Sequence, residues 1–380
     1  MPNTLPPLSL YVHIPWCIQK CPYCDFNSHA VKEPIPEARY IQALLNDLQR
    51  DMTTFSINRS LSSIFIGGGT PSLLSPQAIS DLLAGISTQI SLLPDVEITL
   101  EANPSTVEAN KFAEFNSLGI NRLSIGIQSF NDTYLQKLGR VHDAKQAFLA
   151  VERAYSAGFS NVNLDLMFGL PTQTLAESQA DIQTAIDLDP QHLSFYQLTL
   201  EPNTYFHRYP PSLPDDQISF IMQTNAQQQL AARGFEQYEI SAYSKNNACC
   251  KHNLNYWQFG DYLGIGAGAH GKISCALPNN IVRTVKLRSP AHYLATQDNR
   301  TITPVQPHEL PLEFMMNHAR LKQGFSLKTY EYATGLEAST LKTTLSPLIT
   351  EGLLVEKKGH YRCTEQGWNF LDCLLEKFIP

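Results

Sequence analysis

The sequence contains no long hydrophobic run. No segment approaches the roughly 18 consecutive apolar residues that a membrane-spanning helix requires, so no such helix is predicted. Residues 1–10 carry no positive charge before their apolar residues, which gives no support to a secretory signal peptide. These absences predict a cytoplasmic protein, for which only peripheral contact with a membrane is left open.

An excess of basic residues is also missing. The chain has 28 Lys and Arg residues against 35 Asp and Glu residues, which gives a net charge of −7. Because nucleic-acid binders are generally basic, this balance predicts no nucleic-acid partner. The hydrophobic content of 43% is that of an ordinary globular protein, and we find no internal repeat or low-complexity tract. Fibrous and disordered classes are therefore excluded.

Cysteine is sparse, with 8 residues in a chain of 380. They are spread too widely for the disulfide framework of a small secreted domain. Three of them nevertheless lie close together, at Cys17, Cys21 and Cys24. In a reducing compartment such crowding is typical of metal or cluster ligation.

Strand-like and helix-like stretches alternate between residues 8 and 240. Short stretches rich in Val, Ile, Leu and Phe predict strands at 8–13, 63–67, 97–101, 122–127, 161–167 and 192–196. Amphipathic stretches between them predict helices at 37–52, 76–90, 106–118, 143–157, 174–188 and 214–233. This order predicts an α/β fold with right-handed crossovers and a parallel sheet. Six such units suit a partial (β/α)6 barrel.

The pattern changes after residue 240. Residues 260–271 are rich in glycine and predict a closely packed loop, and residues 290–311 are rich in proline and predict a linker. From residue 312 the pattern is helical, with a strand hairpin at 353–355 and 361–363, which is a winged-helix-like outline. We therefore expect a core barrel over 1–240, a glycine-rich extension and linker over 241–305, and a small helical C-terminal domain over 306–380.

The three clustered cysteines have the spacing C-x-x-x-C-x-x-C and follow the first predicted strand directly. Three thiolates on one loop can hold three irons of a [4Fe–4S] cubane and leave the fourth iron open for another ligand. A zinc site completed by His13 or His29 is the alternative. It is less favoured, because closed structural zinc sites normally show a second pair of ligands.

This spacing is the signature of the radical S-adenosylmethionine (radical SAM) superfamily, which the chain resembles over nearly its whole length. Within it the chain resembles the HemN/HemW family, which includes an oxygen-independent coproporphyrinogen III dehydrogenase and a haem chaperone. The motifs that carry the resemblance are Tyr11-Val-His-Ile-Pro-Trp-Cys17, Gly67-Gly-Gly-Thr70-Pro71, Glu101-Ala-Asn-Pro104, Ser124-Ile-Gly-Ile-Gln128-Ser-Phe and Asp165-Leu-Met-Phe-Gly-Leu-Pro171. The resemblance implies that Cys17, Cys21 and Cys24 bind a [4Fe–4S] cluster and that S-adenosylmethionine binds its open iron.

Several of these motifs stand at the ends of successive predicted strands, where a barrel carries its working residues. A glycine loop allows close backbone approach to a ligand, and a charged residue such as Asp165 is costly in an apolar strand unless it is paired. Taken singly, each residue is as easily structural as functional. The resemblance implies that S-adenosylmethionine is contacted by Tyr11, Tyr23, Gly68, Gly69, Thr70, Glu101, Gln128, Arg140 and Asp165.

Two features favour the chaperone branch over the dehydrogenase branch. The dehydrogenase motif continues to a fourth cysteine where this chain has Phe26, and the chain has only ten residues before Tyr11. In addition, His252-Asn-Leu-Asn-Tyr256-Trp257 resembles the H-N-x-x-Y-W motif of the chaperone branch. Because imidazole is a standard axial ligand of haem iron, His252 is the predicted haem ligand.

Other assignments for this region stay open. His252 can equally form only internal hydrogen bonds, and His270, Cys249 and Cys250 are further candidate ligands. We therefore expect a haem chaperone that binds haem, a [4Fe–4S] cluster and S-adenosylmethionine. It transfers haem to a client protein, such as a respiratory haem enzyme, as a monomer or a dimer.

The alternatives are enzymes. The first is the oxygen-independent coproporphyrinogen III dehydrogenase, which would use the same cluster for oxidative decarboxylation; Phe26 counts against it. The second is a radical enzyme acting on nucleic acid, which has only the winged-helix outline in its favour and is opposed by the acidic net charge.

Overall fold

A computed structural model describes residues 5–275, 280–296, 298 and 300–379. One 12-stranded sheet runs through the molecule in the order β14-β13-β12-β11-β1-β4-β5-β6-β7-β8-β10-β9. Its central six strands are all parallel and alternate with helices, which confirms the predicted α/β class and partial barrel. They are β1 (Leu8–Ile14), β4 (Leu61–Gly68), β5 (Leu92–Ala102), β6 (Arg122–Gln128), β7 (Val162–Phe168) and β8 (His192–Gln197).

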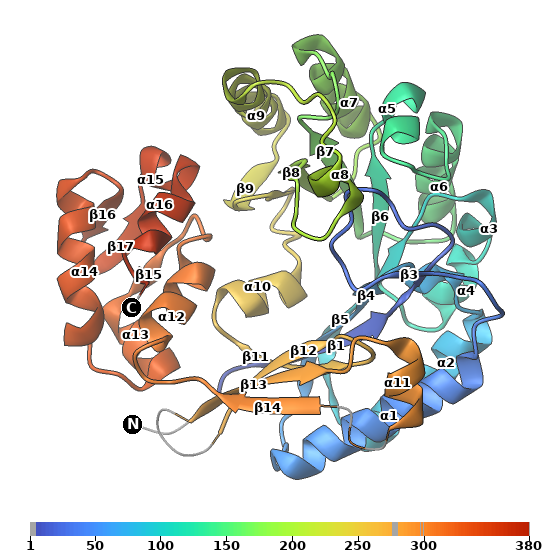
Figure 1. Ribbon diagram of the computed structural model, residues 1–380, viewed down its shortest axis with the longest axis horizontal. Coiled ribbons are helices and arrows are strands. Elements are labelled where there is room, and N and C mark those ends of the chain that lie inside the picture. Colours follow the sequence, from blue (N-terminus) through green and yellow to red (C-terminus); the bar gives the residue numbers. More distant parts are fainter. Residues whose placement is uncertain (1–4, 276–279, 297, 299, 380) are drawn as a thin grey trace.

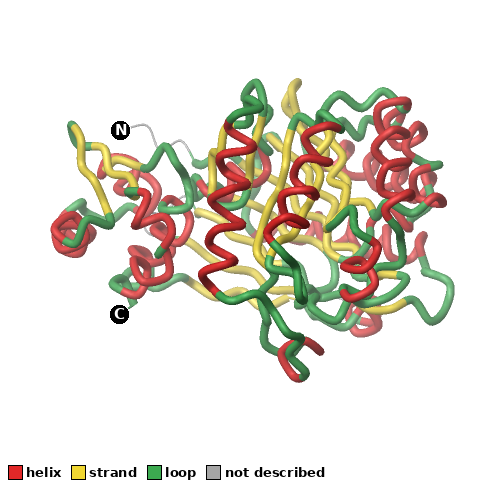
Figure 2. The backbone as a smooth tube through the Cα atoms, turned by 90° about the horizontal axis from the view of Figure 1, so that it is seen from above, coloured by secondary structure: helices red, strands yellow, loops and turns green. Residues whose placement is uncertain are grey.

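Helices cover the outside of these strands, as Figures 1 and 2 show. Ser75, Asp143 and Thr174 each begin a helix by accepting a hydrogen bond from a backbone N–H of its first turn. The expected helix at 106–118 is divided into two short helices at Asn110 and Lys111. The helices of the barrel are α1 (Glu37–Thr54), α2 (Pro76–Gln89), α3 (Thr106–Ala109), α4 (Phe112–Ser117), α5 (Asp132–Lys137), α6 (Ala144–Ser156), α7 (Leu175–Asp187), α8 (Tyr205–Arg208), α9 (Asp216–Ala231) and the 3-10 turn η1 (Pro71–Leu73).

The barrel strands alternate between apolar and polar residues. In β1, Leu8, Leu10 and Val12 are buried in the main hydrophobic core with the helices, whereas Ser9 belongs to the opposite face. There Ser9 accepts a hydrogen bond of 2.8 Å from Ser63 of β4. The same alternation in the other strands gives the barrel a polar interior, and this interior leads to the site described below.

We expected the glycine-rich stretch 260–271 to be a loop, but most of it is β-strand. It contains β11 (Asp261–Ile265), which pairs in parallel with β1, and the start of β12 (His270–Ser274). A Cβ atom on Gly264 would lie 1.9 Å from the His270 carbonyl oxygen, and one on Gly271 would lie 2.4 Å from Thr284 Oγ1. The glycines therefore allow strands to pack closely rather than breaking them.

The expected linker at 290–311 also has regular structure. It includes α11 (Pro290–Ala295) and β14 (Arg300–Pro304), which pairs with β13 (Ile281–Lys286). Pro290 and Pro311 occupy the first turn of a helix, Pro304 an exposed position on the edge strand and Pro307 a turn, where a missing N–H costs little. Lys286 of β13 forms buried ion pairs with Asp47 and Asp51 of α1, at 2.5 and 2.8 Å, which fix this extension to the barrel.

Residues 310–379 form a separate unit, called here the C-terminal module, at one end of the molecule (Figures 1 and 2). Its helices surround their own hydrophobic core, and the predicted hairpin is present with a third short strand. The elements are α12 (Leu310–His318), β15 (Phe325–Ser326), α13 (Leu327–Thr334), α14 (Ser339–Thr350), β16 (Leu354–Lys357), β17 (His360–Cys363), α15 (Glu365–Asn369) and α16 (Leu371–Glu376).

Between the barrel and the C-terminal module lie the edge strands β9 (Glu236–Glu239) and β10 (Ala242–Ser244) and the helix α10 (Lys251–Trp257). Strand β10 pairs antiparallel with both β8 and β9, so β9 ends the sheet on this side. In the described part of the chain, every helix is either too short or too polar to cross a bilayer.

Candidate cofactor site

A cavity of about 320 Å³ opens where β4, β5, β6 and β7 end, beside the loop that carries the three cysteines. The carboxyl ends of the strands are the expected place for a site in such a barrel. The cavity brings together the predicted residues from five segments of the chain: Cys17, Cys21, Tyr23, Cys24, Gly68, Gly69, Thr70, Glu101, Gln128, Arg140 and Asp165. Tyr11 and His252 do not line it.

The cysteine loop lies between two short paired strands, β2 (Trp16–Cys17) and β3 (His29–Ala30). A turn closed by the Cys24 N–H and the Cys21 carbonyl, at 3.1 Å, brings these two thiols to the same side. The Arg140 guanidinium lies 3.7 Å from Cys21 Sγ, and Ser28 Oγ lies 3.5 Å from Cys24 Sγ. Burial raises the pKa of the Cys17 and Cys24 thiols, although nearby hydroxyl groups oppose the shift.

These thiols fit a cluster better than a zinc ion. All three are half-buried, unpaired and exposed to one cavity, which is the donor set that a cubane with one open iron needs. His13 offers no further ligand, because its Nδ1 meets the Tyr11 hydroxyl at 2.9 Å and its Nε2 meets the Asn27 carbonyl at 3.0 Å. His29, the other histidine considered for zinc, has a buried Nε2 without a hydrogen-bond partner, so it stays the alternative ligand.

The glycine loop after β4 is fixed by the protein itself. Gly68 has a φ of +114°, and a Cβ atom there would lie 2.5 Å from the His13 ring. A Cβ atom on Gly69 would lie 2.5 Å from the carbonyl oxygen of Trp16. Substitution of Gly69 would thus displace the residue before Cys17, so a Gly69→Val variant would not leave the cysteine loop undisturbed.

Two carboxyl groups face the cavity from β5 and β7, the two strands that flank β6. Glu101 accepts a hydrogen bond of 2.9 Å from the Gly68 N–H, and burial raises its pKa to about 7. Asp165 accepts hydrogen bonds from Ser124 at 3.1 Å and Asn163 at 2.8 Å, and burial raises its pKa as well. Such buried acids favour a ligand that brings its own positive charge.

Two further polar residues, Arg140 and Gln128, line the same cavity. Arg140 donates hydrogen bonds to Asn103 Oδ1 at 2.6 Å and to the Gly126 carbonyl at 2.8 Å. Gln128 has a φ of +69°, which is rare for a residue other than glycine, and accepts a hydrogen bond of 2.9 Å from the Tyr196 hydroxyl. The backbone turn at Gln128 directs its side chain away from the regular strand.

Asn103, Ser124, Ser194 and Tyr196 also line the cavity, and sequence reasoning did not select them. A signal existed for three of them. In β8 the residues His192, Ser194 and Tyr196 are polar or aromatic at every second position, so they share the inner face of the strand. Asn103 follows Glu101 by two residues and so also lies on that side.

Tyr11 and His252 lie deeper in the barrel. His252 is 1% exposed; its Nδ1 lies 3.0 Å from Ser63 Oγ and its Nε2 lies 2.9 Å from the Tyr256 hydroxyl. Burial lowers its pKa to about 3. Both ring nitrogens are thus occupied, which is contrary to the expected open ligand for haem iron; His270, by contrast, is exposed.

Cys249 and Cys250, which precede His252, are not open ligands for haem iron either. Cys250 is fully buried and donates to Glu97 at 3.5 Å, and Cys249 lies 3.3 Å from the Ser244 hydroxyl.

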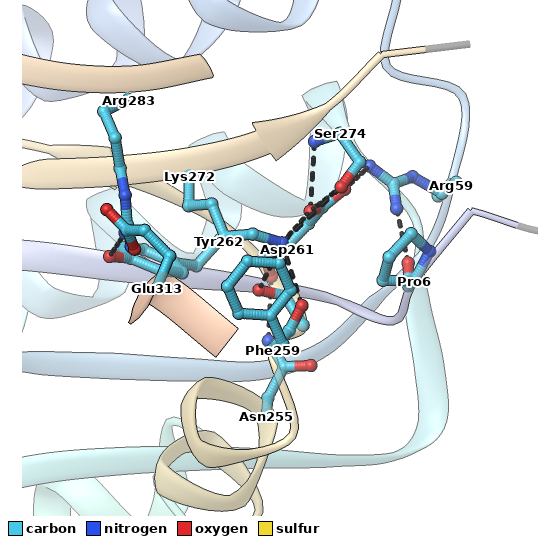
Figure 3. A network of polar contacts seen from close by, with 11 residues as sticks. Pro6, Arg59, Asn255, Phe259, Asp261, Tyr262, Lys272, Ser274, Arg283 and Glu313 are labelled. Carbon is cyan, nitrogen blue, oxygen red and sulfur yellow. Dashed lines mark hydrogen bonds and ion pairs between the residues drawn. The ribbon is translucent and has the colours of Figure 1, made fainter. Parts of the chain in front are cut away.

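The helix α10 instead joins the barrel to the C-terminal module. The Tyr256 ring lies 4.3 Å from the Tyr262 ring, whose hydroxyl accepts a hydrogen bond of 2.8 Å from Arg283. Arg283 is in turn ion-paired with Glu313 of α12, as Figure 3 shows. Beside it, the Trp257 ring lies 4.3 Å from the Arg320 guanidinium. The H-N-x-x-Y-W residues therefore link the barrel interior to the C-terminal module.

Comparison with known proteins agrees with this architecture. Residues 11–185 match the model of the radical SAM superfamily, and residues 305–370 match that of the HemN C-terminal domain. Coproporphyrinogen III oxidase (HemN) from Escherichia coli has a similar structure, with a TM-score of 0.82 and 21% identity. The match covers 98% of this chain and 90% of that one, and it shows the shared fold.

The barrel and its cysteine loop thus define a radical SAM protein, a class that implies a [4Fe–4S] cluster and S-adenosylmethionine. Heme chaperone HemW of Escherichia coli strain K12 is 48% identical, with 99% of both chains covered. Heme chaperone HemW of Haemophilus influenzae is 50% identical, with 99% of this chain and 98% of that one covered. The chain belongs to the HemW family.

Proposed function

We propose that this protein is a haem chaperone, which binds haem and passes it to a client protein that lacks it. The observation that carries the proposal is the identity of 48% and 50% with heme chaperones over essentially whole chains. The likeness to coproporphyrinogen III oxidase is one of fold, at 21% identity. Phe26, which stands where the dehydrogenase branch has its fourth cysteine, lies at the cavity and is 60% exposed.

The cavity supports a definite arrangement of the cofactors. Cys17, Cys21 and Cys24 would hold the [4Fe–4S] cluster, which supplies one-electron reduction when bound. Carboxylates of Glu101 and Asp165 would attract the positive charges of S-adenosylmethionine, while Arg140 would meet its carboxylate. The further contacts are Tyr23, Gly68, Gly69, Thr70 and Gln128, which all line the same cavity.

The client follows from the proposed activity. It is a protein that accepts haem in a reducing cytoplasm, such as a respiratory haem enzyme. The three clustered thiols support that compartment, because they stay available for a cluster only where they are kept reduced.

The deciding experiment separates carrying from catalysis. Protein reconstituted with iron and sulfide without oxygen is titrated with ferric haem and then mixed with a haem-free acceptor. We expect a saturable absorption change, followed by transfer of haem to the acceptor. The same protein is given reductant, S-adenosylmethionine and coproporphyrinogen III, and the products are separated by chromatography. Multiple turnovers to protoporphyrinogen, or no saturable haem binding, would contradict the proposal.

A further inference from the structure

Strand β6 has an irregular end at the cofactor cavity. Ile125 of β6 is paired with Leu164 of β7, and Gln128 with Leu166, so β6 contains one residue more than β7 over this interval. Such an extra residue is a β-bulge, which bends a strand and re-aims its side chains. The bulge ends at Gln128, whose φ of +69° is a strained conformation for a residue other than glycine. Strain of this kind persists only where neighbouring groups hold the backbone, and two separate groups do so here.

One of these groups is the loop that carries Arg140. Arg140 donates to the Gly126 carbonyl at 2.8 Å, and His142 Nε2 lies 3.1 Å from the next carbonyl, that of Ile127. Because a carbonyl oxygen only accepts, Nε2 carries the ring hydrogen. Among the described residues the buried Nδ1 has no hydrogen-bond partner, so the imidazole makes this single bond. Burial and the neighbouring Arg140 cation lower the pKa of His142 to about 3, which leaves the ring neutral at physiological pH.

The other group is Asp181 of α7. Its carboxylate accepts hydrogen bonds of 2.7 Å from the Ser129 hydroxyl and from the Phe130 N–H, directly after Gln128. Asp181 and Ser129 are buried, so water does not compete for these bonds. The turn at Gln128 is therefore held independently of His142, and the loss of the His142 bond would fall on the loop instead.

His142 stands behind the cavity wall. It is 4% exposed and is not among the described residues that line the cavity, whereas Arg140, two positions earlier in the chain, is. The Arg140 guanidinium also donates to Asn103 Oδ1 at 2.6 Å. The position of the guanidinium thus depends on its own hydrogen bonds and on the place where His142 fixes the loop backbone. A neutral ring suits this role, because a second cation beside Arg140 would repel it.

We propose that His142 is a positioning residue for Arg140: by binding the Ile127 carbonyl it fixes the loop so that the guanidinium meets the carboxylate of S-adenosylmethionine. This inference rests on the cofactor arrangement proposed above, in which Arg140 has that role. A guanidinium–carboxylate pair depends on geometry, because the N–H groups point in fixed directions. Binding groups of this kind need to be held within about 0.5 Å of their productive positions, and buried hydrogen bonds behind them supply that precision.

The test compares two ligands in variants of the full-length protein that carry a reconstituted cluster. His142→Leu removes the donor and keeps a buried side chain, whereas His142→Gln supplies an amide N–H near the position of Nε2. His292→Leu, at an exposed histidine of α11, is the matched control. Calorimetry measures the affinity of each protein for S-adenosylmethionine and for its decarboxylated form, which lacks the group that Arg140 would meet. Iron content and circular dichroism check the cluster and the fold.

We expect His142→Leu to bind S-adenosylmethionine about tenfold more weakly and the decarboxylated form within about twofold of the original protein, because the charge-assisted contact of Arg140 is lost. His142→Gln should restore the affinity to within about threefold, and the control should bind both ligands as the original protein does. In the original protein, nuclear magnetic resonance of histidine labelled in its ring nitrogens should show His142 as the neutral Nε2–H tautomer at neutral pH. That measurement does not depend on whether a variant folds.

Equal loss of affinity for both ligands in folded His142→Leu, or no recovery in His142→Gln, would show a merely structural residue and overturn the inference. Unchanged affinity in His142→Leu, or a charged ring or an Nδ1–H tautomer in the original protein, would overturn it too and leave the S-adenosylmethionine site intact. If the original protein binds neither ligand, the proposed cofactor site is wrong and the inference falls with it. Haem transfer is measured separately, so none of these outcomes depends on the chaperone function.

Discussion

Single residues of the cofactor cavity combine burial with charge. Glu101 and Asp165 are acids on the inner faces of β5 and β7, the strands that flank β6, and burial raises the pKa of each. Arg140 lines the same cavity and is held by Asn103 and the Gly126 carbonyl. A cavity that holds both acids and a guanidinium suits an amino acid with an ammonium and a carboxylate group. The methionine part of S-adenosylmethionine has both groups, which supports the proposed contacts.

The affinity for S-adenosylmethionine should depend on pH through Glu101. Its pKa of about 7 means that it is mostly protonated at pH 6 and mostly ionised at pH 8. Only the ionised carboxylate attracts an ammonium group, so the affinity should rise by about tenfold over this interval. Glu101→Gln should bind more weakly and lose most of this dependence. Calorimetric titration at several pH values measures it, and an unchanged pH dependence in the variant would refute the assignment.

Each cysteine of the loop should be indispensable to the cluster. Replacing Cys17, Cys21 or Cys24 with Ala leaves two thiolates, which cannot hold a cubane stably. Iron should fall from about four atoms per chain to nearly none. Cys373→Ala, which changes an exposed cysteine far along the chain, is the matched control and should keep its iron. Stoichiometric zinc without iron, in protein purified without oxygen, would contradict the cluster.

Among the elements, the seven-residue helix α10 has a larger role than its length suggests. Glu97 of β5 accepts hydrogen bonds from the backbone N–H groups of Lys251 and His252, which fixes the start of the helix. His252 then enters the barrel interior, whereas Tyr256 and Trp257 lead to the C-terminal module. Displacement of α10 would therefore affect both parts of the molecule.

His252→Ala should reduce stability rather than haem affinity. The substitution removes two buried hydrogen bonds and leaves the Tyr256 hydroxyl without its partner, which costs about 2–4 kcal/mol, whereas Ser63 keeps its bond to Ser9. Urea unfolding measures this loss, and His308→Ala, at an exposed position, is the control. Haem titration of the folded variant should stay within about twofold of the original. A variant of unchanged stability that loses haem would instead identify His252 as the ligand.

On the scale of the whole molecule, two hydrophobic cores meet at one boundary. The larger fills the space between barrel strands and helices, and the smaller lies inside the C-terminal module. Phe259, which follows α10, belongs to the smaller core although it precedes the module by 51 residues of chain (310 − 259 = 51). Its ring lies 6.0 Å from that of Phe314 and 4.1 Å from the Lys272 ammonium.

Phe259→Ala should therefore separate the unfolding of the two parts. Loss of this buried ring should lower the free energy of unfolding by about 3–5 kcal/mol. The ring lies at the contact between the barrel and the C-terminal module, so that contact is weakened. Calorimetry should show the transition of the C-terminal module at a lower temperature than that of the barrel. Phe220→Ala, which removes a half-exposed ring on α9, should leave the transitions together. A single transition at the original temperature in Phe259→Ala would contradict this.

Much of the barrel and part of its site could be predicted from the local sequence pattern. The six strands were predicted within a few residues, because runs of branched and aromatic side chains between capped amphipathic stretches are a local property. The cysteine spacing and the motifs at the strand ends also identified 11 of the 24 residues that line the cavity. Parallel strands place their carboxyl ends together, so sequence position at a strand end is enough to bring such residues to one site.

Only the tertiary structure decided the rest. The glycines of residues 260–271 allow close strand packing, and nothing local distinguishes that use from a loop. His252 resembles an exposed ligand in the sequence, yet Ser63, 189 residues away, and Tyr256 occupy its nitrogens. A groove between β9 and the C-terminal module is lined by residues of 227–243 and of 321–369, segments that lie 78 residues apart in the chain. Whether a side chain is buried, and which hydrogen-bond partner it has, depends on which distant segments pack together. The local sequence pattern does not determine that packing.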